Sequence, residues 1–166
     1  MIFLISGIPG AGKTTVSRAL AMRFDRAVHL EGDLIGHAFI VSGLVPADGQ
    51  PADEAQRQLD LRRENIRMLA RSFCDAGFVT VIDDVVVSPK LLEYYEAIGP
   101  IRFVQLCPRP DVVEARDAAR DKQFFHVFKH LEEQRSMWPE PRPGLWLDSS
   151  DLTVDGTVTA ILSATS

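Results

Sequence analysis

The sequence predicts an α/β protein built on a parallel sheet that helices cover on both faces. Short apolar runs alternate with longer segments of helical periodicity along the 166 residues. The apolar runs are nearly continuous, which is typical of strands buried on both faces. A glycine-rich turn joins the first apolar run to the first helical segment. The length fits one domain, which we expect to span residues 1–166.

The predicted elements follow in a regular order. Residues 2–6 form a branched apolar run, and Val16, Leu20 and Phe24 recur every four residues in a helix predicted over 13–24. Further strands are predicted over residues 27–30, 78–82, 101–106 and 145–147. Further helices are predicted over residues 53–76, 111–121, 124–137 and 155–164, and another can begin near residue 34. Gly77 and Pro110 suit a helix end and a helix start.

Composition limits the kind of protein and its partners. A formal net charge of -5 gives no support to a nucleic-acid or membrane partner, although a local groove can still bind a polynucleotide. Two isolated cysteines form neither a metal-ligand pattern nor a disulfide framework. No basic leader precedes the short first apolar run, and no run reaches membrane-spanning length. We therefore expect a cytoplasmic protein.

The glycine-rich turn carries the strongest functional signal. Residues 7–14 match the pattern G-x-x-x-x-G-K-[ST] between a strand and a helix, which is the context that a phosphate-binding loop needs. Inward backbone N–H groups and the helix N-terminus attract phosphate, lysine adds a point charge, and threonine offers a hydroxyl to magnesium. We expect a nucleotide, ATP with Mg²⁺, to contact Gly7, Pro9, Gly10, Ala11, Gly12, Lys13, Thr14 and Thr15.

Carboxylates follow two of the predicted strands. Ligands of an open parallel sheet bind at the carboxyl ends of its strands. Asp83 follows an apolar strand, as a Walker B carboxylate does, so we expect it to hold magnesium through water beside Thr14. Asp84 can share that task or face the phosphoryl acceptor. Asp33 can accept a proton from an acceptor hydroxyl as general base, or it can cap a helix, or do both.

Basic and apolar residues complete the candidate site. Arg116 and Arg120 lie four apart on one predicted helix, where they can stabilise a transferring phosphoryl group or form surface ion pairs. The predicted acceptor wall is apolar and includes Phe39, Ile40, Val41, Leu44, Val45, Val85, Val86 and Val87. Such a wall suits an amphipathic molecule with one reactive hydroxyl. The arginines of the 53–76 helix indicate a solvated face, although Arg63 or Arg67 can reach the acceptor.

These motifs together give a family resemblance. The chain resembles small P-loop kinases that phosphorylate an alcohol, a group that includes gluconate kinase, polynucleotide 5′-hydroxyl kinases, zeta-toxin-like kinases and chloramphenicol phosphotransferase. The resemblance rests on residues 7–14, on Gly32-Asp33-Leu34-Ile35 and on Ile82-Asp83-Asp84-Val85. Residues 147–153 are similar to the segment that flanks adenine in such kinases. The loop over residues 39–52 matches no family pattern.

The resemblance implies a fold, an activity and roles for residues. It implies a three-layer P-loop NTPase fold whose five parallel strands have the adenylate-kinase-like order 2-3-1-4-5. It also implies an acceptor region near 34–76 and a lid near 116–135. Asp33 would be the catalytic base, and Lys13, Arg116 and Arg120 would act on the phosphates. The expected activity is ATP-dependent transfer to a small antibiotic-like or nucleoside-like hydroxyl compound, with antibiotic resistance as one outcome. Alternatives are a polynucleotide or nucleoside 5′-hydroxyl kinase and a non-catalytic nucleotide-binding switch.

Overall fold

A five-stranded parallel sheet forms the centre of the protein. The computed structural model describes residues 1–118 and 138–165. The strand order is β2-β3-β1-β4-β5, which confirms the expected order. The strands are β1 (Ile2–Ser6), β2 (Ala27–Glu31), β3 (Val79–Asp83), β4 (Ile101–Leu106) and β5 (Leu145–Leu147).

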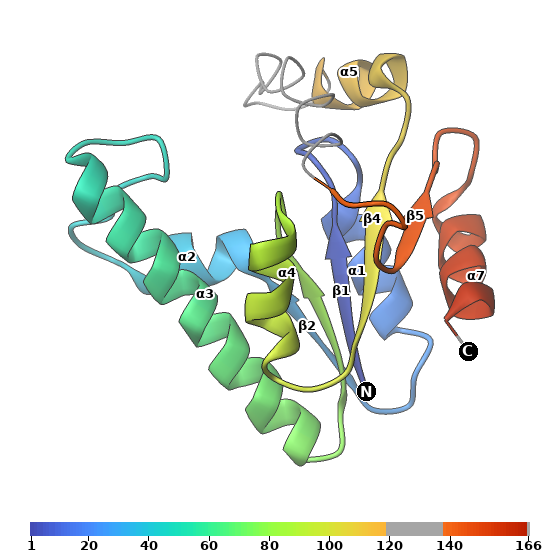
Figure 1. Ribbon diagram of the computed structural model, residues 1–166, viewed down its shortest axis with the longest axis horizontal. Coiled ribbons are helices and arrows are strands. Elements are labelled where there is room, and N and C mark those ends of the chain that lie inside the picture. The colour runs from blue at the N-terminus through green and yellow to red at the C-terminus, as the bar shows by residue number, and fades with distance from the viewer. Residues whose placement is uncertain (119–137, 166) are drawn as a thin grey trace.

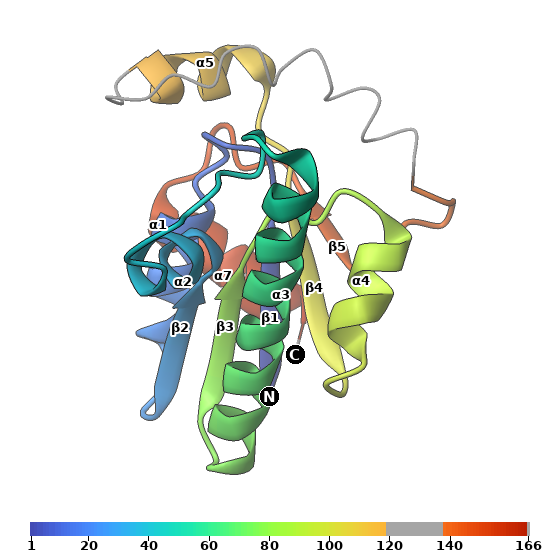
Figure 2. The same ribbon diagram turned by 90° about the vertical axis from the view of Figure 1, so that its left-hand side faces the viewer.

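Helices cover both faces of the sheet, as expected for three layers. The described helices are α1 (Lys13–Ala21), α2 (Gly32–Phe39), α3 (Ala52–Asp75), α4 (Pro89–Glu96), α5 (Pro110–Ala118) and α7 (Val154–Ala164). In Figure 1, α3 and α4 lie to the left of the sheet and α7 lies to its right, and Figure 2 shows α3 in front of the strands. No described helix has the length and apolar character that crossing a membrane requires.

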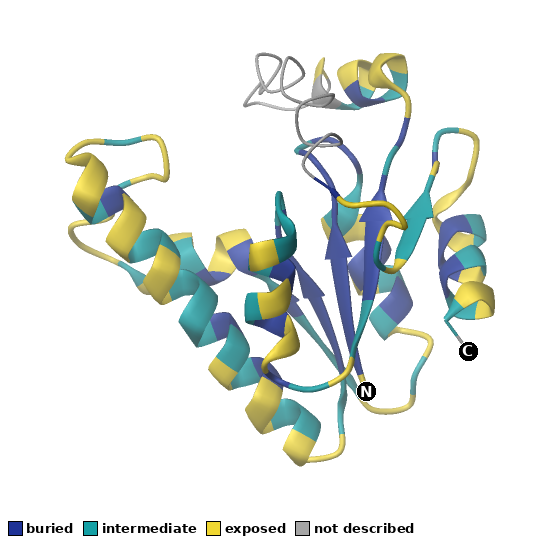
Figure 3. Ribbon diagram, in the orientation of Figure 1, coloured by how far each residue is buried: buried dark blue, intermediate teal, exposed yellow. Residues whose placement is uncertain are grey.

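The two-residue period of the strands divides the core in two. Leu4 faces the side covered by α3 and α4, whereas Ile5 faces the side covered by α1 and α7. Both side chains have an exposed fraction of 0%. Figure 3 shows the resulting band of buried residues along the central strands. Because side chains fill both faces, the sheet leaves only its strand ends for a ligand.

Some elements differ from the expected ones. Helix α4 was not predicted, although Ser88 caps it by accepting a hydrogen bond from the Leu91 N–H at 3.4 Å and Pro89 occupies its first turn. Helix α1 ends at Ala21 instead of residue 24, yet Phe24 still packs against Phe3 at 5.9 Å between ring centroids. Strand β3 extends to Asp83, one residue further than expected. The helix predicted over 124–137 lies outside the described residues.

The fold predicts how strongly two positions on α3 affect stability. Ile66 has an exposed fraction of 0% and packs against the strands, whereas Met68 on the same helix is 62% exposed. Ile66→Ala should lower the free energy of unfolding by about 2–5 kcal/mol, because it leaves a cavity. The matched Met68→Ala should change it by no more than about 0.5 kcal/mol. Urea denaturation measures both, and equal losses would contradict this packing of α3.

Candidate active site

The phosphate-binding loop connects β1 to α1 at the carboxyl edge of the sheet. The strand tips point toward this edge and toward α5 (Figure 1). Gly12 is the N-cap of α1 with φ 93°, and among the described residues no side chain caps the helix. The positive φ suits glycine and turns the loop inward. The first-turn N–H groups are therefore available for an anion, which fits phosphate binding.

The loop is held rigidly against the core. Ile8 and Ala11 are 3% and 1% exposed, and a Cβ on Gly7 would lie 2.9 Å from the Leu106 carbonyl oxygen. Lys13 Nζ donates to the Ile8 carbonyl oxygen at 3.2 Å. Thr14 and Thr15 open the exposed first turn of α1. The structure thus places Lys13 and Thr14 of the motif, together with the following Thr15, at this loop.

Arg116 of α5 reaches the same loop. Its Nη1 donates to the Ala11 carbonyl oxygen at 3.4 Å and lies 3.7 Å from the position of a Cβ on Gly12. This contact crosses 105 positions of sequence, so it results from the fold. Arg120 lies outside the described residues, as does most of the lid expected over 116–135. Arg116 thus lies beside the phosphate-binding loop, and its role toward a phosphate stays a prediction.

The two aspartates at the end of β3 face opposite sides of the sheet. Asp83 continues the face of Val79 and Val81, which packs against α1. Its Oδ2 lies 2.6 Å from Nε2 of His29 on the neighbouring strand, and its side chain is 5% exposed. Asp83 is therefore on the same side of the sheet as the phosphate-binding loop, which suits its expected role near magnesium.

The donor set fits a magnesium ion held mainly by phosphate oxygens. Mg²⁺ is bound through one or two carboxylates and hydroxyls together with substrate phosphates and water. Thr14 and Asp83 supply oxygen atoms of this kind. No group of three or more histidine, cysteine, aspartate or glutamate side chains within the described ranges could hold a metal by itself.

Asp84 faces α3 and α4 and is fully engaged there. Its Oδ1 accepts from Nη2 of Arg62 at 2.7 Å, and its Oδ2 accepts from the Tyr95 hydroxyl at 2.6 Å. The exposed fractions of Asp84 and Tyr95 are 3% and 0%. Burial and the adjacent Asp84 raise the pKa of Tyr95, so its hydroxyl stays a donor. Both oxygens of Asp84 thus accept hydrogen bonds from the protein, and its expected role beside magnesium or the acceptor stays a prediction.

Asp33 lies in the first turn of α2. The alternative role as helix cap is wrong, because Glu31 is the N-cap. The Asp33 side chain is 73% exposed, and its Oδ1 accepts from Nη1 of Arg62 at 2.9 Å. A Cβ on Gly32 would lie 2.9 Å from the Asp83 carbonyl oxygen, so the glycine lets α2 begin directly beside the end of β3.

The expected acceptor wall is divided between core and surface. Val86 is 2% exposed and belongs to the core, whereas Phe39 and Val41 are 64% and 93% exposed. An open pocket of about 320 Å³ lies between α3 and α4 instead. Its lining residues are Asp60, Arg63, Val87, Ser88, Lys90, Leu91 and Tyr94. Of the residues expected at the acceptor, Arg63 and Val87 line this pocket.

Arg62 is the main site residue that the sequence interpretation missed. Its side chain is 14% exposed and bridges two carboxylates, whereas Arg57 and Arg71 of the same helix are 80% and 63% exposed. The expectation of a solvated arginine face is therefore wrong for Arg62. Its partners lie 29 and 22 positions away in sequence, so helical periodicity gives no signal for them.

A second missed contact fixes the loop that follows β5. Arg109 donates to both oxygens of Asp151, at 2.7 and 2.9 Å, and the Arg109 N–H donates to Ser150 Oγ at 2.7 Å. The hydrogen bonds from Arg109 lower the pKa of Asp151, and those from Ser150 lower the pKa of Asp148. The segment that resembles an adenine-flanking loop is thus tied to the residues that follow β4.

The loop geometry predicts a selective effect of Gly12→Ala. Alanine at φ 93° should cost roughly 1–2 kcal/mol of stability, because a Cβ disfavours left-handed backbone. Gly43→Ala is a matched control, since Gly43 has φ 74° and nothing within 4 Å of a Cβ. Thermal unfolding with and without ATP and Mg²⁺ measures binding, because a ligand stabilises the folded state. Only Gly12→Ala should shrink the ligand-induced shift in Tm, and an unchanged shift would contradict phosphate binding by this loop.

Comparisons with known proteins agree with this geometry. The model of an AAA domain family, AAA_33, matches residues 2–141. No curated protein matches the sequence. Among solved structures, the Deinococcus radiodurans tunicamycin resistance protein is 20% identical with a TM-score of 0.71, covering 98% of this chain and 93% of that chain.

Two further solved structures share the fold. A sugar kinase from Janibacter sp. HTCC2649 is 18% identical with a TM-score of 0.69, covering 98% of this chain and 92% of that chain. A gluconokinase from Sinorhizobium meliloti 1021 is 18% identical with a TM-score of 0.64, covering 98% and 89%. With the family match over most of its length, the chain belongs to the AAA_33 family of AAA domains, a family of small P-loop kinases.

Proposed function

We propose that the protein transfers the γ-phosphoryl group of ATP to a hydroxyl group of a small molecule, with Asp33 as general base. One observation carries the proposal, namely the different surroundings of three neighbouring carboxylates. Asp83 lies on the side of the phosphate-binding loop, Asp84 is buried, and Asp33 is exposed at the same strand edge. Asp33 is thus the carboxylate that an incoming acceptor can reach.

The proposed reaction is an in-line displacement at phosphorus. The acceptor hydroxyl gives its proton to Asp33 as its oxygen bonds to the γ-phosphorus, and the bond to the β–γ bridging oxygen breaks to release ADP. Arg62 occupies Oδ1 of Asp33, so Oδ2 would face the hydroxyl. Lys13 and Arg116 would neutralise charge on the phosphate oxygens. Mg²⁺, held by Thr14 and through water by Asp83, would supply further neutralisation of the phosphates when bound.

The pocket between α3 and α4 supports a small acceptor. Its volume of about 320 Å³ lies in the range of small-molecule sites. Val87, Leu91 and Tyr94 give it apolar walls, whereas Arg63 and Lys90 add positive charge. Such a lining suits an amphipathic alcohol with a polar or anionic group. Antibiotic-like and nucleoside-like alcohols and sugar acids are the classes to be compared.

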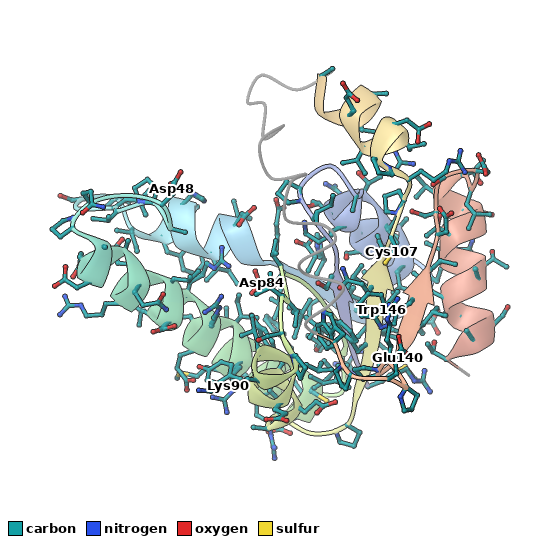
Figure 4. All side chains as sticks on the ribbon, turned by 45° about the horizontal axis from the view of Figure 1, so that its top comes forward. Asp48, Asp84, Lys90, Cys107, Glu140 and Trp146 are labelled. Carbon is teal, nitrogen blue, oxygen red and sulfur yellow. The ribbon has the colours of Figure 1, made fainter. Side chains whose placement is uncertain are left out.

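Asp33→Asn tests the base. The amide cannot accept a proton, so phosphoryl transfer should fall by about 10²–10⁴-fold while ATP affinity stays within a few-fold. A panel of antibiotics with free hydroxyls, nucleosides, sugars, sugar acids and a 5′-hydroxyl oligonucleotide, assayed with ATP and Mg²⁺, identifies the acceptor. Asp48→Asn is the control, because Asp48 is exposed on the loop before α3, away from Asp84 (Figure 4).

Each result of this panel has a definite meaning. Full activity of Asp33→Asn would remove Asp33 from the mechanism. Transfer only to the oligonucleotide would favour a polynucleotide kinase. ATP binding without transfer to any acceptor would favour a nucleotide-binding switch.

Arg63→Gln tests the acceptor pocket. The Arg63 side chain is 18% exposed. Its contact with Asp60 is long, 3.4 Å from Nη1 to Oδ1, so the guanidinium group can still bind a ligand. Removing the charge should raise the KM for the acceptor about 10-fold, the effect of losing one charged hydrogen bond of about 1.5 kcal/mol. The KM for ATP should stay unchanged. Arg57→Gln, at an 80% exposed position of the same helix, is the matched control, and equal effects of the two variants would exclude the pocket.

A further inference from the structure

Arg62 connects the exposed Asp33 to the interior of the protein. Its Nη1 donates to Asp33 Oδ1 at 2.9 Å and its Nη2 donates to Asp84 Oδ1 at 2.7 Å. The Tyr95 hydroxyl holds the other oxygen of Asp84 at 2.6 Å. Four side chains from α2, α3, α4 and the end of β3 thus form one chain of hydrogen bonds, in the order Asp33, Arg62, Asp84 and Tyr95.

The two ends of this chain differ sharply in burial. The side chain of Asp33 is 73% exposed on an eight-residue helix, whereas the side chain of Asp84 is 2% exposed and Tyr95 is 0% exposed. A general base must keep its oxygen within a fraction of an ångström of the reacting hydroxyl. An exposed aspartate does not hold one rotamer without a partner. Among the described residues, Arg62 is the one hydrogen-bond partner of the Asp33 carboxylate, whereas His37 contacts only the Asp33 backbone carbonyl.

The backbone around Arg62 is shaped for this contact. A Cβ on Gly36 would lie 3.1 Å from Cδ of Arg62. Helix α2 therefore passes closest to Arg62 at a glycine, where the helix has no side chain. A Cβ on Gly32 would lie 3.1 Å from Oδ1 of Asp84. Both glycines of α2 therefore leave room for the bridge, which would be crowded by any larger residue.

We infer that Arg62 is a positioning residue, which holds Asp33 in its catalytic rotamer, and that Asp84 and Tyr95 anchor Arg62. This inference rests on the proposed function, because it assumes that Asp33 is the base. It assigns Asp84 to the positioning of Arg62 and leaves the magnesium side to Asp83. A planar guanidinium group reaches two carboxylates at once, which the single ammonium group of lysine cannot do in the same geometry.

The first test is a double-mutant cycle on phosphoryl transfer. Arg62→Gln should lower kcat by about 10²-fold, as a displaced catalytic group does, and leave the KM for ATP unchanged. Arg62→Lys should recover less than a tenth of the lost activity. In an Asp33→Asn background, Arg62→Gln should cause no further loss, because it acts only through Asp33. A further loss there, or a rise only in the KM for the acceptor, would show direct contact with substrate and overturn the inference.

The buried carboxylate needs its own variant. Arg62→Gln leaves Asp84 without its cation, so the doubly neutral Arg62→Gln/Asp84→Asn protein is made beside it. If Arg62 acts by positioning, this folded double variant should be as slow as Arg62→Gln. Wild-type activity in the double variant would overturn the inference. Arg57→Gln, which removes an 80% exposed arginine of the same helix, should behave as wild type.

A second test does not depend on activity. Hydrogen exchange of the backbone amides of residues 32–39 should be at least 10-fold faster in Arg62→Gln/Asp84→Asn than in wild type, because the first turn of α2 loses its hydrogen bond to α3 and only the packing of Ile35 still holds the helix. Unchanged exchange would overturn the inference even if no acceptor is found. Transfer by wild type that Asp33→Asn leaves intact would instead refute the proposed base, while faster exchange would still support the bridge.

Discussion

The end of β3 is the constraint on which the rest of the site depends. Successive residues of a strand point to opposite faces, so Asp83 and Asp84 meet different partners. Asp83 meets His29 on the side of α1, and Asp84 meets Arg62 and Tyr95 on the side of α3 and α4. Two adjacent residues therefore connect the end of β3 to both helical layers.

The free-energy cost of burying a charge explains why both oxygens of Asp84 have hydrogen-bond partners. An unpaired buried charge destabilises a protein by about 3–5 kcal/mol when its partner is removed. Asp84 avoids that cost by accepting hydrogen bonds on both oxygens, at 2.7 and 2.6 Å. Because the buried Asp84 needs a cation beside it, the guanidinium group of Arg62 is held next to Asp84. The ion pair between Arg62 and Asp84 thus stabilises the interior and also places the guanidinium group that binds the exposed Asp33.

Local patterns explain what the sequence predicts and what it misses. The alternation of strands and helices is a local pattern and predicts the layers. The phosphate-binding motif is also local and predicts which residues meet the nucleotide. The order of the strands is not local, and only the family resemblance implies it. Helix α4 has only eight residues, which is too short for a clear helical period, so Ser88-Pro89 is its one local signal. Extending the predicted strand by one residue to Asp83 would have separated the two aspartates by face. Arg62 is buried by partners that are distant in sequence, whereas Arg57 is exposed, and helical periodicity does not reveal such partners.

The pocket between α3 and α4, which we propose for the acceptor, is lined by segments outside the sheet. The phosphate-binding loop and the aspartates lie directly at the ends of strands. The pocket is lined instead by residues of α3, of α4 and of the segment just before α4. Solved proteins described as a sugar kinase, a gluconokinase and a tunicamycin resistance protein share this fold at 18–20% identity. Helix α3 can both contact Asp33 and line the pocket, because neighbouring residues of a helix point in directions about 100° apart. Arg62 therefore contacts Asp33 and Arg63 lines the pocket, so the lining of the pocket can change while the contact with Asp33 stays the same.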